Sequence, residues 1–290
     1  TTVFLFSSFT YDAFVIALLM LGIALFVTEY LSEEKIQTKR TMVSILAMVV
    51  GCFSKAVYIP FLALYWLMPK DKFYSRRQKN LFKAGIFVLL ILMFASFILP
   101  LIGNVTSGAE VGDYRGGDTS QTSQLSMILG YPLTYTGVLL KSLGTTFASY
   151  FIGSKVLANF AYRGIYDGIG YFVVLLTMLF TFVTDFGMTE KIYDAQMKRK
   201  IFIMKIWNAV LIFGTACLIW TALYLDFTPV GSMVINGVSP RYYLPLIFPL
   251  SFIFINQKVR CSMKLENYQS LIAFLMLIGT GISIYCLMLA

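Results

Sequence analysis

Arg241 is the residue whose type and position most clearly suggest chemistry. It opens an apolar segment that continues to Ile255, and Tyr242 and Tyr243 follow it directly. An arginine at the end of a membrane helix keeps its charge, so it needs an anion or a carboxylate close by. Phosphate fits this need because the planar guanidinium group can hold it with two hydrogen bonds. The alternatives are a snorkelling arginine at the membrane boundary and an internal ion pair, and the stretch alone favours none of the three.

Two more ionisable residues lie within apolar surroundings. Lys55 stands in the middle of a long apolar block, in Lys55-Ala-Val-Tyr58-Ile-Pro60, and Asp12 lies in the first apolar segment. An ionisable residue inside a membrane segment is a functional candidate by default. Phosphate binding by Lys55 competes with a lysine that simply reaches for lipid headgroups. For Asp12, a structural partnership with Lys55 or Arg241 is favoured over direct catalysis.

The composition identifies the class of protein that must position these residues. Of 290 residues, 58% are hydrophobic and 13% are charged, whereas soluble domains have about a quarter of their residues charged. Several uncharged runs are long enough to cross a bilayer, which predicts an all-α, polytopic transmembrane helical bundle. The net charge of +9 comes from basic residues in short loops between apolar runs, a distribution that favours membrane topology signals over nucleic-acid binding.

The chain contains no histidine, which excludes histidine general bases, Ser-His-Asp triads and histidine metal sites. Its cysteines are scattered in or beside apolar segments without metal-ligand spacing, so we expect apolar packing residues and neither a metal site nor a disulfide framework. They are Cys52, Cys217, Cys261 and Cys286. The sequence thus identifies no cofactor and leaves room for a divalent cation.

Loop charge decides how the block from Met42 to Leu67 crosses the membrane. Of the loops on either side of it, Glu29–Arg40 is mixed but ends basic, and Lys70–Lys83 carries a clear basic excess. A single crossing would place them on opposite faces, whereas a hairpin that turns near Lys55 places both in the cytoplasm, as the positive-inside rule prefers. We therefore expect two short halves, with Lys55 at or near the outer face.

The remaining segments follow from the same reasoning, and the economical interpretation is a single domain, 1–290, with about eight membrane segments. Those expected besides the hairpin are Val3–Val27, Ala84–Ile102, Gly168–Thr184, Ile206–Leu225, Arg241–Ile255 and Asn267–Leu289.

The connections complete the predicted topology. The near-neutral region of about 103–170 suits the outer face, with Thr134–Phe151 as an interfacial or re-entrant helix. The basic loop Asp185–Lys205 suits the cytoplasm. Because the chain starts with Thr1 inside an apolar run, we expect it to be the C-terminal part of a longer protein.

This topology gathers Asp12, Lys55, the glycine-rich loop Asp113–Asp118 and Arg241 at the outer face. No nucleotide is supplied there, so a transferase would need a donor carried by lipid. Basic residues at the membrane boundary are the groups that a lipid phosphate requires. Tyr242 suits the aromatic belt of the membrane interface, and an aromatic ring beside an arginine can also stack on a sugar.

Four motifs resemble those of the bacterial domain-of-unknown-function family 2142, a group of membrane proteins that looks related to the GT-C glycosyltransferases. The most specific extends from Thr228-Pro-Val-Gly231 through Gly237-Val-Ser-Pro-Arg241-Tyr-Tyr-Leu-Pro245. The others are Ser8-Phe-Thr-Tyr-Asp12-Ala, Ser54–Pro60 and Gln124–Pro132. Ser239-Pro240 replaces the Gln-Gly that the family pattern places before the arginine.

The resemblance implies a membrane glycosyltransferase of the bacterial cytoplasmic membrane. Its donor would be a polyprenyl-phosphate sugar and its acceptor a cell-envelope glycan or lipid. By that analogy Lys55 and Arg241 would hold the donor phosphate, while Asp12, Tyr58 and Tyr242 would shape the site. GT-C enzymes carry their catalytic acid in the first outer loop, which would lie before Thr1, so the catalytic residue stays unassigned. The alternatives are a transporter or flippase of lipid-linked glycans and a non-enzymatic membrane scaffold.

Overall fold

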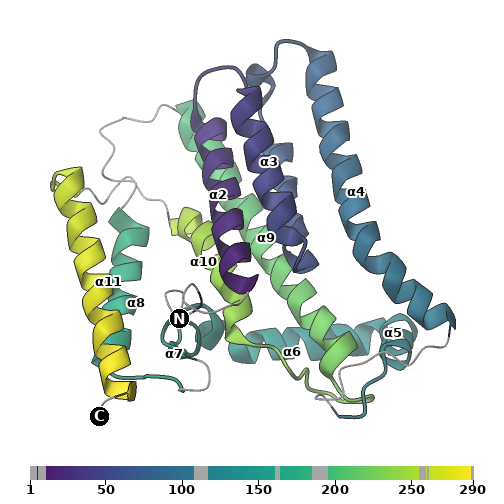
Figure 1. Cartoon of the computed structure of the whole chain (residues 1–290). Coiled ribbons are helices and arrows are strands. Elements are labelled where there is room, and N and C mark those ends of the chain that lie inside the picture. The colour runs from purple at the N-terminus through teal and green to yellow at the C-terminus, as the bar shows by residue number, and fades with distance from the viewer. Residues whose placement is uncertain are drawn as a thin grey trace. The chain divides into compact units, whose positions relative to one another are not determined.

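The computed structural model describes residues 5, 11–107, 117–160, 164–184, 195–254, 259 and 261–288. Within these ranges the chain is built from helices, and four of them are long and apolar enough to cross a membrane (Figure 1). They are α2 (Tyr11–Leu31), α4 (Arg76–Ser107), α9 (Ala195–Phe227) and α11 (Leu265–Met288). This confirms the predicted all-α, polytopic membrane protein.

The chain divides into two compact units. One combines residues 14–146 with 210–242, and the other combines 1–13, 147–209 and 243–290. We call them the hairpin unit and the C-terminal unit, and each is described by itself. The single domain expected from the sequence stays a prediction.

The hairpin unit is organised around α3 (Thr38–Cys52) and η1 (Ala56–Leu67), a 3₁₀ helix. The chain turns at Phe53 and Ser54, so η1 returns toward the end where α3 begins. Hydrogen bonds between the two flanking loops establish this: Ile36 N–H donates to the Lys72 carbonyl at 2.9 Å, and the Lys35 ammonium donates to the Asp71 carbonyl at 2.7 Å. Both basic loops therefore lie at one end of the unit, and Lys55 lies at the turn.

Small residues let the first helices of this unit approach closely. Ser44 of α3 donates its hydroxyl hydrogen to the Gly22 carbonyl of α2 at 2.6 Å, and the Tyr65 hydroxyl of η1 donates to Ser44 at 2.5 Å. A Cβ atom at Gly22 would lie 2.5 Å from the Met48 side chain. Glycine is thus required where α2 and α3 meet, which is typical of helix packing in membranes.

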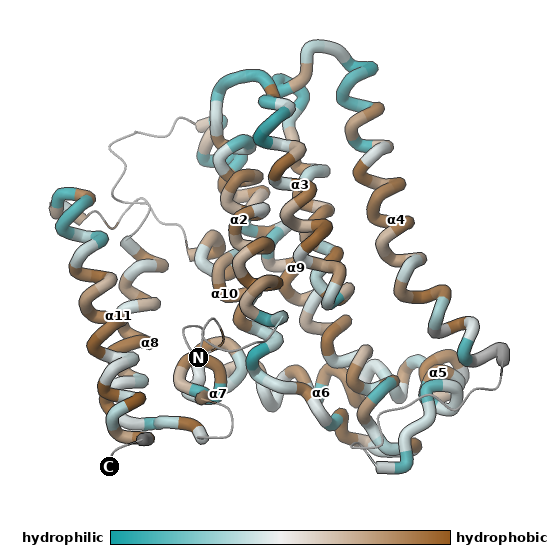
Figure 2. Tube along the Cα trace, viewed as in Figure 1, coloured by the Kyte–Doolittle hydropathy of each residue, from teal (hydrophilic) through white to brown (hydrophobic). Residues whose placement is uncertain are grey.

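Hydrophilic residues gather in the α2–α3 connection and the first turns of α4, and hydrophobic residues dominate the middle of α4 (Figure 2). Two further helices follow α4, namely α5 (Gln121–Gly130) and α6 (Pro132–Phe151). Figure 1 shows α6 running across the lower end of α9 and not along it, and the Tyr135 and Thr221 hydroxyls join the two helices at 2.6 Å. The interfacial or re-entrant position predicted for Thr134–Phe151 stays a prediction.

The C-terminal unit contains the pair α8 (Ile169–Thr184) and α11, which pack along their length. Their contact also depends on glycine, because a Cβ atom at Gly279 would lie 2.9 Å from the Gly170 carbonyl oxygen. The Thr184 and Tyr268 hydroxyls, 2.8 Å apart, join the two helices further along. The unit also holds α7 (Ser154–Leu157), α10 (Leu244–Ser251) and the short 3₁₀ helix η7 (Phe252–Phe254).

Several helices extend further than the sequence predicted. The first helix does not end at Val27 but continues to Leu31, because Glu29 is buried and its carboxylate accepts the Gln37 N–H at 3.0 Å and pairs with Arg40 at 3.4 Å. Its predicted start at Val3 falls outside the described residues.

The other extensions run into segments that were predicted as loops, and those of α4 and α9 are basic. α4 begins at Arg76 instead of Ala84, α9 begins at Ala195 instead of Ile206, and α11 begins at Leu265 instead of Asn267. Hydropathy marks only the apolar part of a helix, whereas lysine and arginine are good helix formers in the solvated turns beyond it.

The hairpin yields a topology test by cysteine labelling. We expect Ser54→Cys, beside Lys55, to react with a membrane-impermeant maleimide from outside the cell, and Lys79→Cys only after the membrane is opened. The background would be a variant in which the four native cysteines, all free thiols, are replaced. Labelling of both positions from the same side would contradict the hairpin topology.

Candidate functional site

The candidate site begins at the turn between α3 and η1. Lys55 immediately precedes η1 with an extended backbone, and its N–H donates to the Cys52 carbonyl at 3.0 Å. Three residues later, Tyr58 is fully buried. Pro60 lacks a backbone N–H, and it lies within this 12-residue 3₁₀ helix, which is long for its type. The turn therefore presents Lys55 at the tip of the hairpin and anchors Tyr58 beneath it.

The second part of the site comes from residues almost 200 positions away. Pro240 opens the 3₁₀ turn η6 (Pro240–Tyr243), and the Tyr242 N–H donates to the Ser239 carbonyl at 3.0 Å. Proline suits the first position of a helix, because its φ is already fixed and no N–H is lost there. This turn places Arg241 and Tyr242, both half-buried, against the hairpin.

Contacts to Tyr242 join the two parts. The Tyr58 hydroxyl donates to the Tyr242 carbonyl at 2.7 Å. The Lys55 ammonium lies 4.0 Å from the centre of the Tyr242 ring, and the Arg241 guanidinium carbon lies 5.6 Å from the same centre. Both distances are within the range of cation–π attraction. Two cations from distant segments therefore share one aromatic ring.

This arrangement is suited to binding an anion. An oxyanion beside the Tyr242 ring could accept charge-assisted hydrogen bonds from both groups. The four side chains of this site can bind and orient a ligand. They are Lys55, Tyr58, Arg241 and Tyr242. Because none of them is a carboxylate, a general base would have to come from another residue.

A network of buried hydrogen bonds fixes the loop that leads into Arg241. Gln124 of α5 is fully buried, and its amide N–H groups donate to the Thr228 and Pro229 carbonyls at 2.9 and 3.0 Å. The Thr228 hydroxyl accepts the Asn236 N–H at 3.1 Å. The Asp118 carbonyl accepts the Val230 N–H at 3.0 Å. Residues 228–236, which lead toward Arg241, are thus held at both ends of the segment.

Gly237 determines how this loop turns toward Arg241. Its φ of 78° lies in the left-handed region, and an added Cβ atom would overlap the Phe227 ring. Only glycine satisfies both conditions without rearrangement. Ser239 therefore lies between Gly237 and the η6 turn, and Pro240 is the first residue of that turn.

The structure brings together four of the five predicted site residues, Lys55, Tyr58, Arg241 and Tyr242. The fifth, Asp12, is 5% exposed and lies in the first turn of α2, where an acidic side chain complements the positive end of the helix dipole. It belongs to the C-terminal unit, so its partnership with Lys55 or Arg241 stays a prediction. Asp113 lies outside the described residues.

Sequence reasoning did not find the role of Gln124. It lies in one of the four motifs, and its partners Thr228 and Pro229 lie in another. In the same way the Ser54–Pro60 motif is joined to that second motif, because the Tyr58 hydroxyl donates to the Tyr242 carbonyl. These contacts depend on how the segments pack, and the separate motifs gave no signal of which residues would pair.

The comparison with known families identifies the family of the chain. The model of the family described as predicted membrane protein (DUF2142) matches residues 1–250. The chain belongs to the DUF2142 family. The match includes both sides of the Lys55–Tyr242–Arg241 site and the Gln124 network. No curated protein and no solved structure matches the chain.

Proposed function

We propose that this DUF2142 protein is a glycosyltransferase of the GT-C type in the cytoplasmic membrane of a bacterium. It would take a sugar from a polyprenyl-phosphate carrier at the extracytoplasmic face and transfer it to a cell-envelope glycan or lipid. The observation that carries the proposal is the convergence of Lys55 and Arg241 on the Tyr242 ring.

The location of the site supports a lipid-borne donor. Lys55 is separated from the basic loops by the 15 residues of α3, a rise of about 22 Å. The hydrocarbon core of a bilayer is about 30 Å thick. With the basic loops in the cytoplasm, Lys55 would lie in the outer half of the membrane, about 8 Å short of the far side of the core. Local thinning of the bilayer and the length of the lysine and arginine side chains would bring their charges to a lipid phosphate.

The chemistry assigned to these residues is stabilisation of the leaving group. An acceptor hydroxyl oxygen attacks the anomeric carbon of the sugar, and the bond from that carbon to the phosphate oxygen breaks. The electron pair stays on the polyprenyl phosphate, and the hydroxyl proton passes to a base that is not among the four site residues. Lys55 and Arg241 would stabilise the charge that develops on the phosphate. Tyr242 would keep the two cations in place and offer its ring to the sugar.

The direct test is transfer by purified full-length protein in vesicles. Polyprenyl-phosphate glucose and mannose with a radiolabelled sugar would serve as donors, and a bacterial envelope fraction would supply acceptors, with and without Mg²⁺. We expect label to enter the envelope fraction, and the double variant Lys55→Met/Arg241→Met to abolish this.

Two outcomes would reject the proposal. Labelled lipid that changes leaflet without loss of its sugar would identify a flippase. If the wild-type protein neither binds nor consumes either donor, Lys55 and Arg241 do not hold a donor phosphate.

A further inference from the structure

A second ligand site lies at the opposite end of the hairpin unit, and it does not depend on the proposed glycosyl transfer. We propose that an anionic phospholipid of the cytoplasmic leaflet binds between α3 and α4. Its acyl chain would occupy an apolar groove between the two helices, and its headgroup phosphate would lie in the basic pocket at the start of α4.

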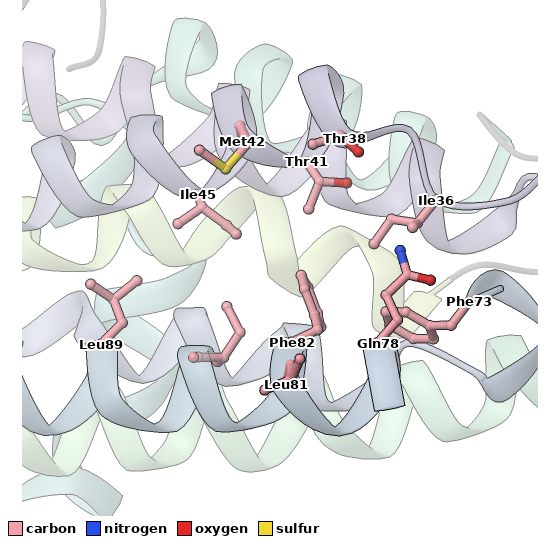
Figure 3. Close-up of a pocket in the computed structure, with 12 residues that line it drawn as sticks. Ile36, Thr38, Thr41, Met42, Ile45, Phe73, Gln78, Leu81, Phe82 and Leu89 are labelled. Carbon is pink, nitrogen blue, oxygen red and sulfur yellow. The ribbon is translucent and has the colours of Figure 1, made fainter. Parts of the chain in front are cut away.

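The groove has a volume of about 320 Å³ (Figure 3). Met42 and Ile45 of α3 face Leu81, Phe82 and Leu89 of α4 across it. Met42 and Leu81 are 63% and 64% exposed, which is costly in water but not against lipid chains. An apolar groove in a membrane-spanning region is therefore a place for hydrocarbon.

The dimensions of the groove fit one leaflet. Its lining residues on α4 extend from Gln78 to Leu89, which corresponds to a rise of about 16 Å. Half of a bilayer's hydrocarbon core is about 15 Å. Phe73, which packs on Phe82 at a ring-centre distance of 5.4 Å, marks the end of the groove nearest the basic loops.

Thr41 supplies an independent sign of a missing ligand. Its side chain is on the wall of the groove in Figure 3 and is 4% exposed. Its hydroxyl has no hydrogen-bond partner among the described residues. A buried hydroxyl without a partner is costly, so the site favours a ligand that can accept its hydrogen. The ester carbonyl of a glycerolipid lies between headgroup and acyl chain and is such an acceptor.

The groove adjoins a basic pocket of about 400 Å³ that shares Phe73 with it. Lys70, Arg76 and Lys79 line this pocket, together with Tyr74 and Ser75. Clustered lysine and arginine on the cytoplasmic side of a membrane helix attract anionic headgroups. The basic pocket, the Thr41 hydroxyl and the apolar groove thus follow one another in the same order as the phosphate, the ester group and the acyl chain of a phospholipid.

The experiment uses the full chain in nanodiscs that contain phosphatidylcholine with a small fraction of phosphatidylglycerol. Lipids retained by the protein after detergent extraction would be counted by native mass spectrometry. We expect phosphatidylglycerol to be enriched over its share of the nanodisc. Arg76→Gln and Lys79→Gln should each lower the enrichment about fivefold, while Arg77→Gln, next to the pocket but not lining it, should leave it unchanged.

Gly85→Phe tests the groove itself. Gly85 lines the groove, and a Cβ atom there would meet no atom within 4 Å, so the ring can fill the groove without disturbing the helices. Retained phosphatidylglycerol should fall to background in Gly85→Phe but not in the control Gly214→Phe, at a glycine of α9 that is equally open. Thr41→Val, which removes only the hydroxyl group, should also lower retention.

Three results would overturn the proposal. These are equal retention of phosphatidylglycerol and phosphatidylcholine by the wild type, equal retention in the Gly85 and Gly214 variants, and full displacement of the lipid by soluble glycerol phosphate. The last would identify a site for small anions instead of a lipid.

Discussion

Arg241→Ala is expected to weaken binding of a polyprenyl phosphate by about tenfold to about 150-fold. A hydrogen bond to a charged group contributes about 1.5–3 kcal/mol, and each 1.4 kcal/mol corresponds to a factor of ten in affinity. Arg241 shares the Tyr242 ring with Lys55, so its loss removes half of the positive charge at that ring. The measurement is the dissociation constant of a short-chain polyprenyl phosphate for the purified protein.

Two companion variants separate charge from geometry. Arg241→Lys keeps the charge but loses the planar guanidinium group that can make two parallel hydrogen bonds. We therefore expect its affinity for the lipid to lie between that of the wild type and that of Arg241→Ala. Lys141→Ala removes an exposed cation from α6 of the same unit and should change nothing. An Arg241→Ala protein that unfolds at the wild-type temperature and binds the lipid within twofold of wild type would refute the phosphate role of Arg241.

The sequence was sufficient for the membrane class and for the hairpin. Both depend on simple quantities, the length of apolar runs and the sign of the loop charges. Hydrogen bonds between the 32–37 and 68–73 segments place both loops at the same end of the hairpin, as the loop charges predicted. Helix ends were predicted less well, because charged residues such as Glu29 and Arg76 belong to helices although hydropathy places them in loops.

The candidate site was predictable as a set of residue types but not as an arrangement. Lys55 and Arg241 stand out because charge is costly in apolar segments. Their common contact with Tyr242, and the bond from Tyr58 to the Tyr242 carbonyl across 184 positions, depend on how the segments pack. A single sequence contains no local signal for such a pairing.

Lys72 shows the same limit at the other end of the unit. By sequence it is one of several basic residues in a loop, yet it is 1% exposed. Its ammonium group donates to the Ser32 carbonyl and hydroxyl, both at 2.6 Å, and to the Glu34 carbonyl at 3.0 Å. This lysine therefore has a structural role in joining the two loops, which its neighbours on the surface do not share.

Lys72→Ala is accordingly expected to lower the free energy of unfolding by about 2–4 kcal/mol, because three acceptors lose a charged donor in a buried place. The measurement is unfolding in a zwitterionic detergent, by denaturant or heat. Lys72→Met retains the apolar stem but not the charge, so it should recover only the part of the loss that comes from packing.

Lys70→Ala is the matched control, since Lys70 belongs to the same 3₁₀ turn, η2 (Lys70–Lys72), but is exposed. Equal destabilisation by Lys70→Ala and Lys72→Ala would contradict the structural role of Lys72. The proposed donor site lies at the far end of the hairpin, so folded Lys72→Ala protein should bind polyprenyl phosphate as the wild type does. A loss of affinity without a loss of stability would instead mean that the two ends of the hairpin are coupled.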